Sequence, residues 1–425
     1  MWDKLKQAWQ VKEVRNGLLF VFAMMVIFRV AANIPLPGID LVALKRFFDA
    51  NQVLGLLNLF SGGTIRNFSV VALGVAPYIT ASIIFQLLAM IIPRLEEIQK
   101  DGEQGQRRIN QWSRWLTVPL AFIQSFSLLA LLRQSQVPIL TTTSALQITM
   151  IITAVTAGTL FLMWIGELIS EKKVGNGISI IIFAGIVSSL PDHLTKFIST
   201  FDQSQYLTVA VYALVALATI AGVVFISEGQ RNVPVQYARQ SNGQSSAVGG
   251  VASSLPLRVN LTGVIPIIFA VSLLIFPSVI AQYLTRARSE WLVTAATWVL
   301  TTLQNQVIYG TLYFLLVVTF TYFYTSIVFH PDRIAENLQK QGGFIPGIRP
   351  GKPTSEYLTN VINRITLGGA LFLGAIAVLP LVAQAFTGTT TLAVGGTSLL
   401  IVVSVVIESI KQIQSQLTMR EYDVY

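Results

Sequence analysis

The sequence predicts an all-α polytopic membrane protein of about ten transmembrane helices. Of its 425 residues, 53% are hydrophobic and only 12% are charged, which is about half the charged share of an ordinary soluble domain. The apolar residues also gather in long runs, and a helix that crosses a bilayer core of about 30 Å needs about 20 of them in succession. Composition and patterning therefore both place the chain in a membrane.

Ten apolar runs define the predicted helices. The first follows several basic residues, as in a signal peptide, but Arg29 interrupts it and nine further runs follow, so we interpret it as a retained helix. Arg29 has a long stem that can reach the membrane surface. The fifth run is short and is expected to extend through Pro191. The runs cover residues 18–34, 70–92, 115–133, 146–168, 178–190, 207–227, 261–284, 307–329, 365–386 and 392–410.

Lys and Arg are distributed unequally between the two sets of loops. An even number of spans puts both termini on one side, and that side carries 21 basic residues against seven on the other. Loops rich in Lys and Arg remain in the cytoplasm. We therefore expect a multi-pass protein with both termini in the cytoplasm.

Two of the predicted cytoplasmic loops, 228–259 and 330–364, are much longer than a connection between neighbouring helices requires. They hold part of the basic excess behind the net charge of +9. The basic residues have one simple role, which is to set the topology. Long basic loops on one face also favour docking of an acidic partner, nucleic acid included.

The first long loop has the pattern of a protruding β-hairpin. Val233, Val235 and Tyr237 alternate with polar neighbours, as do Leu255, Leu257 and Val259. The stretch between the two segments is rich in Gly and Ser. Alternation on both sides of such a stretch is typical of two strands joined by a turn.

A short internal repeat stands near the start of the second and seventh spans. Residues 74–77 read Gly-Val-Ala-Pro and residues 263–266 read Gly-Val-Ile-Pro. Five spans separate the two copies, so they would have opposite orientations in the membrane. Inverted repeats of this kind are common in transport proteins, although four residues can also match by chance.

Side chains for catalysis or metal binding are scarce. The chain has no cysteine and two histidines, His193 and His330, which we interpret as ordinary helix-end residues. The sequence contains no H-E-x-x-H or G-x-S-x-G motif, and residues 347–353 lack the spacing of a phosphate-binding loop. Mid-span ionisable groups, which an ion-coupled transporter needs, are almost absent. We expect no enzyme activity, no metal site and no cofactor.

Two long segments, 72–87 and 164–179, resemble the signatures of the SecY/Sec61α family of channel proteins. The second segment departs from the family at Lys173, where glycine is usual, which puts the local turn in question. Shorter resemblances follow in family order over nearly the whole chain, at residues 34–40, 58–63, 256–260, 345–351 and 395–400.

The resemblance implies a clamshell of two five-helix halves, 1–205 and 206–425, around an hourglass pore with a lateral opening between the second and seventh helices. It implies a constriction of branched aliphatic side chains, which match here Val75, Ile79, Ile178, Ile182, Ile268 and Ile401. It also implies a plug of the outer vestibule, formed by Leu56, Leu57, Asn58, Leu59, Phe60, Ser61, Gly62 and Gly63. Without the family, these would be ordinary apolar positions and a surface helix.

The function implied by the resemblance is a passive channel that conducts unfolded polypeptide and releases apolar segments into lipid. Implied partners are the SecA motor, the ribosome, the membrane subunits SecE and SecG, and an unfolded preprotein with its signal peptide. The location implied by the resemblance is the bacterial inner membrane, or a thylakoid if the source has one. Docking is expected at Arg231, Arg239, Arg258, Arg349 and Lys352, and in the family the arginine at 349 is needed for motor-driven transport.

Two other functions fit parts of the pattern. The inverted repeat alone is compatible with a secondary transporter for a small solute, and an insertase scaffold is a third possibility. The scarcity of mid-membrane polar ligands and the long basic loops argue against the transporter. Uptake of a solute by the purified protein in liposomes, without a motor, would favour it.

Overall fold

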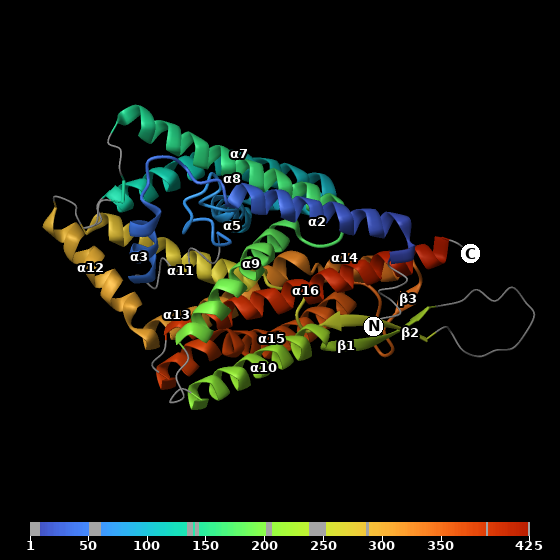
Figure 1. The fold of residues 1–425 in the computed structure, drawn as a ribbon. Helices are drawn as coiled ribbons and strands as arrows, with labels where there is room; N and C mark the ends of the chain where they lie inside the picture. Colours follow the sequence, from blue (N-terminus) through green and yellow to red (C-terminus); the bar gives the residue numbers. More distant parts are fainter. Residues whose placement is uncertain are drawn as a thin grey trace, which may run out of the picture.

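The computed structural model describes residues 9–50, 61–133, 139–140, 144–200, 206–237, 252–285, 289–387 and 390–423, and it is predominantly helical (Figure 1). Each of the ten predicted runs overlaps a helix. These helices are α2 (Lys12–Ala32), α5 (Ala76–Ile91), α7 (Glu103–Arg133), α8 (Ala145–Glu171), α9 (Gly177–Thr200), α10 (Tyr206–Glu228), α11 (Ile265–Leu284), α13 (Gln306–Val328), α15 (Lys352–Thr387) and α16 (Thr390–Asp423).

Length and composition identify seven of the described helical stretches as able to cross a membrane, and an eighth if the bent pair of α5 and α6 (Pro93–Lys100) is one span. The other two predicted spans lie in α7 and α9, and the apolar part of α9, Gly177–Pro191, is shorter than a typical span. The structure thus has the polytopic all-α architecture that the apolar runs predict.

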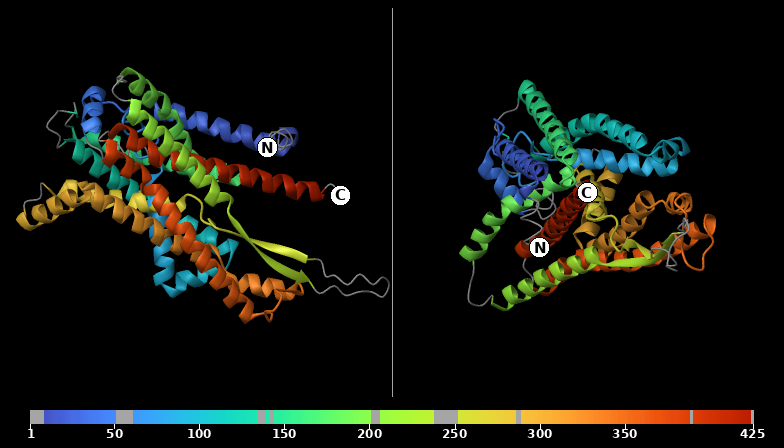
Figure 2. Two further views of the ribbon diagram at one scale, coloured as in Figure 1. Left: turned by 90° about the horizontal axis from the view of Figure 1, so that it is seen from below. Right: turned by 90° about the vertical axis from the view of Figure 1, so that its right-hand side faces the viewer.

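Several elements lie outside the predicted runs. They are the helices α3 (Leu41–Ala50), α6, α12 (Glu290–Gln304) and α14 (Pro331–Lys340), and the strands β1 (Gln230–Tyr237), β2 (Ala252–Arg258) and β3 (Gly343–Phe344). The sheet and α14 lie at one end of the molecule, and α3 and α12 lie at the opposite end (Figures 1 and 2). α2 begins and α16 ends at the end that carries the sheet.

The predicted hairpin is confirmed. β1 and β2 pair antiparallel, with Val233 opposite Leu255. β3, from the second long loop, adds to the other edge of β1 and pairs Tyr237 with Gly343. This third strand was not predicted, because two residues are too few to show an alternating pattern.

The two long loops form one folded unit. Val233, Val235 and Leu257 of the hairpin share a buried apolar cluster with Leu338 of α14 and Ile345 after β3. The first turns of α15 complete the cluster with Leu358, Val361 and Ile362. A shared core of this kind holds the hairpin and the second loop in a fixed relation.

Lys173 adopts the left-handed backbone conformation that its usual family counterpart, glycine, adopts easily. Its φ is +55°, and its N–H donates to the carbonyl of Ser170 at the end of α8 over 3.0 Å. The Gln416 side chain of α16 donates to the Lys173 carbonyl over 2.7 Å. A left-handed turn therefore forms at this position with a lysine, at the cost of backbone strain.

Replacing Lys173 by glycine is expected to increase the free energy of unfolding by about 0.5–1 kcal/mol, because relief of left-handed strain exceeds the added chain entropy. The Lys172→Gly protein is the control, since Lys172 has φ −76° and gains nothing from glycine. It should lose stability by about 1–2 kcal/mol, because glycine adds chain entropy and removes the Lys172 ammonium that lies 4.9 Å from the centre of the Phe20 ring. Denaturant titration of both proteins in detergent measures the difference, and equal losses would contradict the strain at Lys173.

Candidate functional site

The six predicted constriction residues come from four different helices. Val75 and Ile79 stand at the start of α5, and Ile178 and Ile182 occupy the first turns of α9. Ile268 lies in the first turn of α11 and Ile401 in α16. Residues so far apart in the chain meet only if α5, α9, α11 and α16 converge.

The structure brings all six side chains into one apolar cluster. Five of them are buried, with exposed fractions of 5% or less, and Ile178 is half-buried and packs against the same cluster. The cluster is the largest described core and includes side chains from α2, α5, α8, α9, α11, α13, α15 and α16. The predicted residues therefore lie where the helices of the bundle meet.

A cavity of about 470 Å³ borders this cluster. Ile79, Ile178 and Ile268 contribute to its wall, and most of its remaining lining is polar, from α5, α7, α8, α9 and α13. An ion pair between Arg114 of α7 and Glu167 of α8 forms part of this lining. The arrangement is a water-compatible chamber that ends at a group of branched aliphatic side chains.

The repeated motif produces the same local geometry at the starts of α5 and α11. Gly74 and Gly263 have φ of +59° and +63° and each stands two residues before its helix begins. Pro77 and Pro266 are each the second helical residue, where a missing N–H costs nothing. α5 and α11 are also in contact with each other. The motif therefore repeats in structure as well as in sequence.

The described end of the predicted plug, Ser61 to Gly63, packs against the turn that precedes α5 and against α9. A Cβ on Gly74 would lie 2.8 Å from Cα of Ser61, and a Cβ on Gly185 of α9 would lie 2.2 Å from Cα of Gly62. These are backbone-to-backbone approaches that only glycine permits. Gly62 and Gly63 both have positive φ, +74° and +78°. The other predicted plug residues, Leu56 to Phe60, lie outside the described residues.

Four of the five predicted docking residues are described, and all four are exposed at the end that carries the sheet. Arg231 is on β1 and Arg258 on β2. Arg349 lies between β3 and α15, and Lys352 is the first residue of α15. Arg258 is opposite Gln230 in the ladder, whereas Arg231 is opposite Leu257, so the two arginines point to opposite faces of the hairpin. Arg239 lies outside the described residues.

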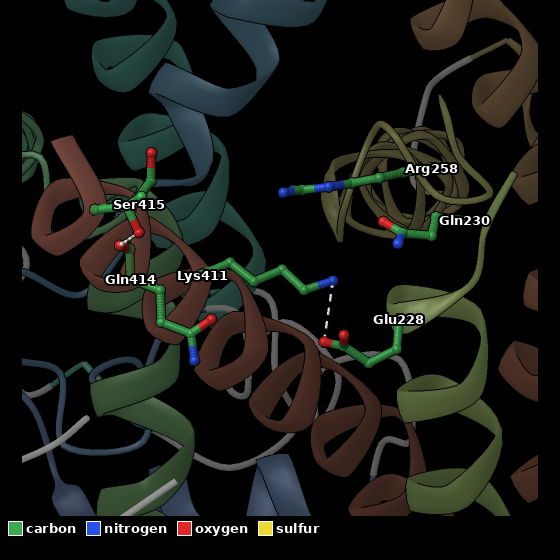
Figure 3. Close-up of a pocket in the computed structure, with 7 residues that line it drawn as sticks. Glu228, Gln230, Arg258, Lys411, Gln414 and Ser415 are labelled. Carbon is green, nitrogen blue, oxygen red and sulfur yellow. Dashed lines mark hydrogen bonds and ion pairs between the residues drawn. The ribbon is translucent and has the colours of Figure 1, made fainter. Parts of the chain in front are cut away.

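Arg258 faces a polar pocket of about 250 Å³ between the base of the hairpin and α16 (Figure 3). Lys411 of α16 enters the same pocket and pairs with Glu228 at the end of α10, with 3.1 Å between Nζ and Oε1. Lys411 also donates to the carbonyl of Ser227. This contact and the Arg114–Glu167 pair were not predicted, because each joins helices whose packing no local sequence pattern shows.

These features define a class of protein: a polytopic helical membrane protein with an apolar cluster beside a polar chamber and a basic folded surface at one end. The SecY family model matches residues 69–410 of the chain. The protein translocase subunit SecY of Streptomyces scabiei is 41% identical over 98% of both chains. That of Halalkalibacterium halodurans is 42% identical over 99% of both. The chain belongs to the SecY family.

Solved channel structures share the fold. A protein-conducting channel superimposes with a TM-score of 0.65 at 18% identity, over 94% of this chain and 91% of that chain. Sec61 in a canine ribosome–channel complex gives a TM-score of 0.60 at 16% identity, with the same coverage. Family membership confirms the predicted function at this level, a channel subunit of a protein translocase, and the prediction that the chain is not an enzyme.

Proposed function

We propose that the chain conducts unfolded polypeptides through a passive pore in the bacterial cytoplasmic membrane, with Val75, Ile79, Ile178, Ile182, Ile268 and Ile401 as the constriction. The observation that carries this proposal is the convergence of these side chains beside the 470 Å³ chamber. A narrow ring of aliphatic groups stays dewetted and blocks ions, yet its side chains can deform around a passing chain.

The lateral exit is proposed to lie between α5 and α11. Residues 1–205 and 206–425 would then form the two halves of a clamshell, since α5 belongs to the first half and α11 to the second. Support comes from the matching geometry at the starts of these helices and from their direct contact. Separation of the two helices would expose a translocating apolar segment to lipid.

Residues 56–63 are proposed to plug the vestibule on the side away from the sheet. The contact of Gly62 with Gly185 ties the end of this segment to α9, which also carries Ile178 and Ile182. Two consecutive glycines with positive φ would allow the segment to swing without strain in the adjoining backbone.

The end of the molecule that carries the sheet is proposed to face the cytoplasm with both termini, as the basic excess indicates. Arg231, Arg239, Arg258, Arg349 and Lys352 would dock the SecA motor or a ribosome. The solved complex of canine Sec61 with a ribosome supports the ribosome as a partner. SecE and SecG are proposed as membrane subunits, because the resemblance to the SecY family implies them.

Changing Ile79 and Ile182 together to serine is expected to raise the resting ion flux at least about tenfold. Each apolar carbon that serine removes contributes about 0.8 kcal/mol to keeping water out of the constriction. Lowering the free-energy barrier to wetting by about 1.4 kcal/mol already raises the flux by a factor of ten. Planar bilayers measure the flux.

The matched control for this change is Ile181→Ser with Ile267→Ser. These neighbours are buried in the same cluster, at 3% and 1% exposure, but are not among the six constriction residues. The control should lose similar stability and leak less. Equal leakage in the two double variants would contradict the assignment of the constriction.

Translocation of a preprotein into liposomes tests the proposed function itself. We expect protease-protected preprotein when the chain is reconstituted with SecA, ATP and the small membrane subunits, and no accumulation when SecA or ATP is omitted. The secondary transporter is the alternative. Uptake of a small solute by the chain without any motor, together with no preprotein transport, would support the alternative and reject the channel.

A further inference from the structure

α12 is a helix where the apolar runs leave only a connection between two spans. It comprises 15 residues, Glu290–Gln304, and joins the end of α11 to the start of α13 at the end of the molecule remote from the sheet (Figures 1 and 2). One side of the helix packs inward. Ala296 is 3% exposed, and Leu303 packs against the main apolar cluster.

The other side of α12 carries two tryptophans. Trp291 and Trp298 are 70% and 67% exposed, and side chains seven positions apart lie on the same face of a helix. No charged residue occurs from Trp291 to Gln304. A helix face that meets bulk water normally carries charged side chains, so this face has the wrong composition for water.

Three threonines on the exposed side have hydroxyl groups that already donate hydrogen bonds within the helix. Thr294 donates its hydroxyl to the carbonyl of Glu290, Thr297 to Val293 and Thr301 to Thr297, each over 2.9 Å. A hydroxyl bonded to the preceding turn of its own helix can leave water without losing a hydrogen bond. The polar groups of this face are therefore compatible with a lipid environment.

We propose that α12 is an interfacial helix whose Trp291–Trp298 face lies in the lipid headgroup region of the leaflet opposite the sheet. Tryptophan favours this region because its ring is apolar while its N–H can still bond to headgroups or water. The face continues into α13, where Val307 is 76% and Ile308 42% exposed. α12 would thereby anchor the α11–α13 connection to the membrane surface.

Site-directed spin labelling tests this proposal, and the chain is suited to it because it contains no cysteine. The probe position is Ala295→Cys, which is exposed between the two tryptophans and leaves both in place. Leu214→Cys on α10, 68% exposed, is the lipid-facing control. Gln341→Cys, exposed next to α14, is the water-facing control.

The full chain is labelled in liposomes of phosphatidylcholine and phosphatidylglycerol, and collisions with oxygen and with a water-soluble nickel chelate are measured. The oxygen-to-nickel accessibility ratio at Ala295→Cys is expected to exceed that at Gln341→Cys about tenfold, which corresponds to 1.4 kcal/mol for excluding the chelate. It should remain below the ratio at Leu214→Cys, because the headgroup region is shallower than the hydrocarbon core.

Two outcomes overturn the proposal. A ratio equal to that of Gln341→Cys places α12 in water, and a label that neither reagent reaches shows that a second copy of the chain covers the face. Tryptophan fluorescence gives a second measurement. The emission lost in the Trp291→Phe, Trp298→Phe protein should be quenched more by lipids brominated near the headgroup than by lipids brominated deep in the chain, and the reverse order also overturns the proposal.

Discussion

Gly185→Ala is expected to raise the resting ion conductance of the channel roughly tenfold. The added Cβ would lie 2.2 Å from Cα of Gly62 and 3.2 Å from the N and C atoms of the same residue. Backbone atoms cannot rotate away as the end of a side chain can, so Gly62 or α9 must shift. Overpacking of this kind costs about 1–3 kcal/mol. A cost of 1.4 kcal/mol raises the population of channels in which Gly62 has moved away from α9 about tenfold, and we expect these channels to conduct ions.

Two control variants separate this contact from other effects of the substitution. Gly368→Ala adds the same methyl group to α15 with nothing within 4 Å, and should leave conductance unchanged. Gly63→Ala also meets nothing within 4 Å but has φ +78°, so it introduces strain next to Gly62 without the contact. Single-channel recording measures all three variants. Wild-type conductance in a normally inserted Gly185→Ala protein would show that Gly62 does not hold the vestibule closed.

The helical architecture could be predicted from the sequence because its cause is local. A bilayer demands long apolar runs, and every predicted run overlaps a helix, from α2 to α16. The hairpin was predictable for the same reason, since Val233 and Val235 alternate with polar neighbours. β3 and α12 were not predicted. β3 has only two residues, which is too short to show an alternation of apolar and polar side chains. α12 is shorter than a membrane span and lacks the charged face of a helix exposed to water.

The site was predictable only in part. The family resemblance implied the proposed constriction positions, whereas the residues alone left Ile79 and Ile268 as ordinary apolar positions. The packing of Gly62 on Gly185 and the pairing of Arg114 with Glu167 join segments that are distant in the chain. Such contacts depend on how helices pack, and no local pattern reports them. At Lys173, the sequence showed that lysine replaces the usual glycine. Only the structure showed that the lysine adopts a left-handed conformation there.

Arg349→Glu is expected to reduce SecA-driven translocation about a hundredfold, and Arg349→Lys about tenfold, while both proteins insert normally. A charge-assisted hydrogen bond is worth about 1.5–3 kcal/mol, which corresponds to factors of about ten to a hundred. Lysine keeps the charge but loses the planar fork that holds a carboxylate or phosphate with two bonds. Glutamate removes both and adds repulsion toward an acidic partner.

The local structure isolates the Arg349 side chain from folding. Ile345 and Ile348, on the same loop, pack into the apolar cluster beneath the sheet. The Thr354 hydroxyl donates to the Arg349 carbonyl over 2.9 Å, so the backbone is fixed by contacts that do not involve the guanidinium. Gly347 and Gly351 have φ of +82° and +95°, which sets the tight turn on either side. The exposed side chain can therefore be exchanged without disturbing the loop.

The alternative role of Arg349 is to contribute one more positive charge to the topology, and lysine would serve that role equally well. Lys340→Glu is the matched control. It reverses an exposed charge in the same long loop, where Lys340 pairs with Glu336 over 2.8 Å, and such surface pairs contribute about 0.5 kcal/mol or less. Its translocation should stay near the wild-type level. Preprotein transport into inverted vesicles, with protease mapping of topology, measures all three proteins, and full activity of Arg349→Glu would leave Arg349 as an ordinary loop charge.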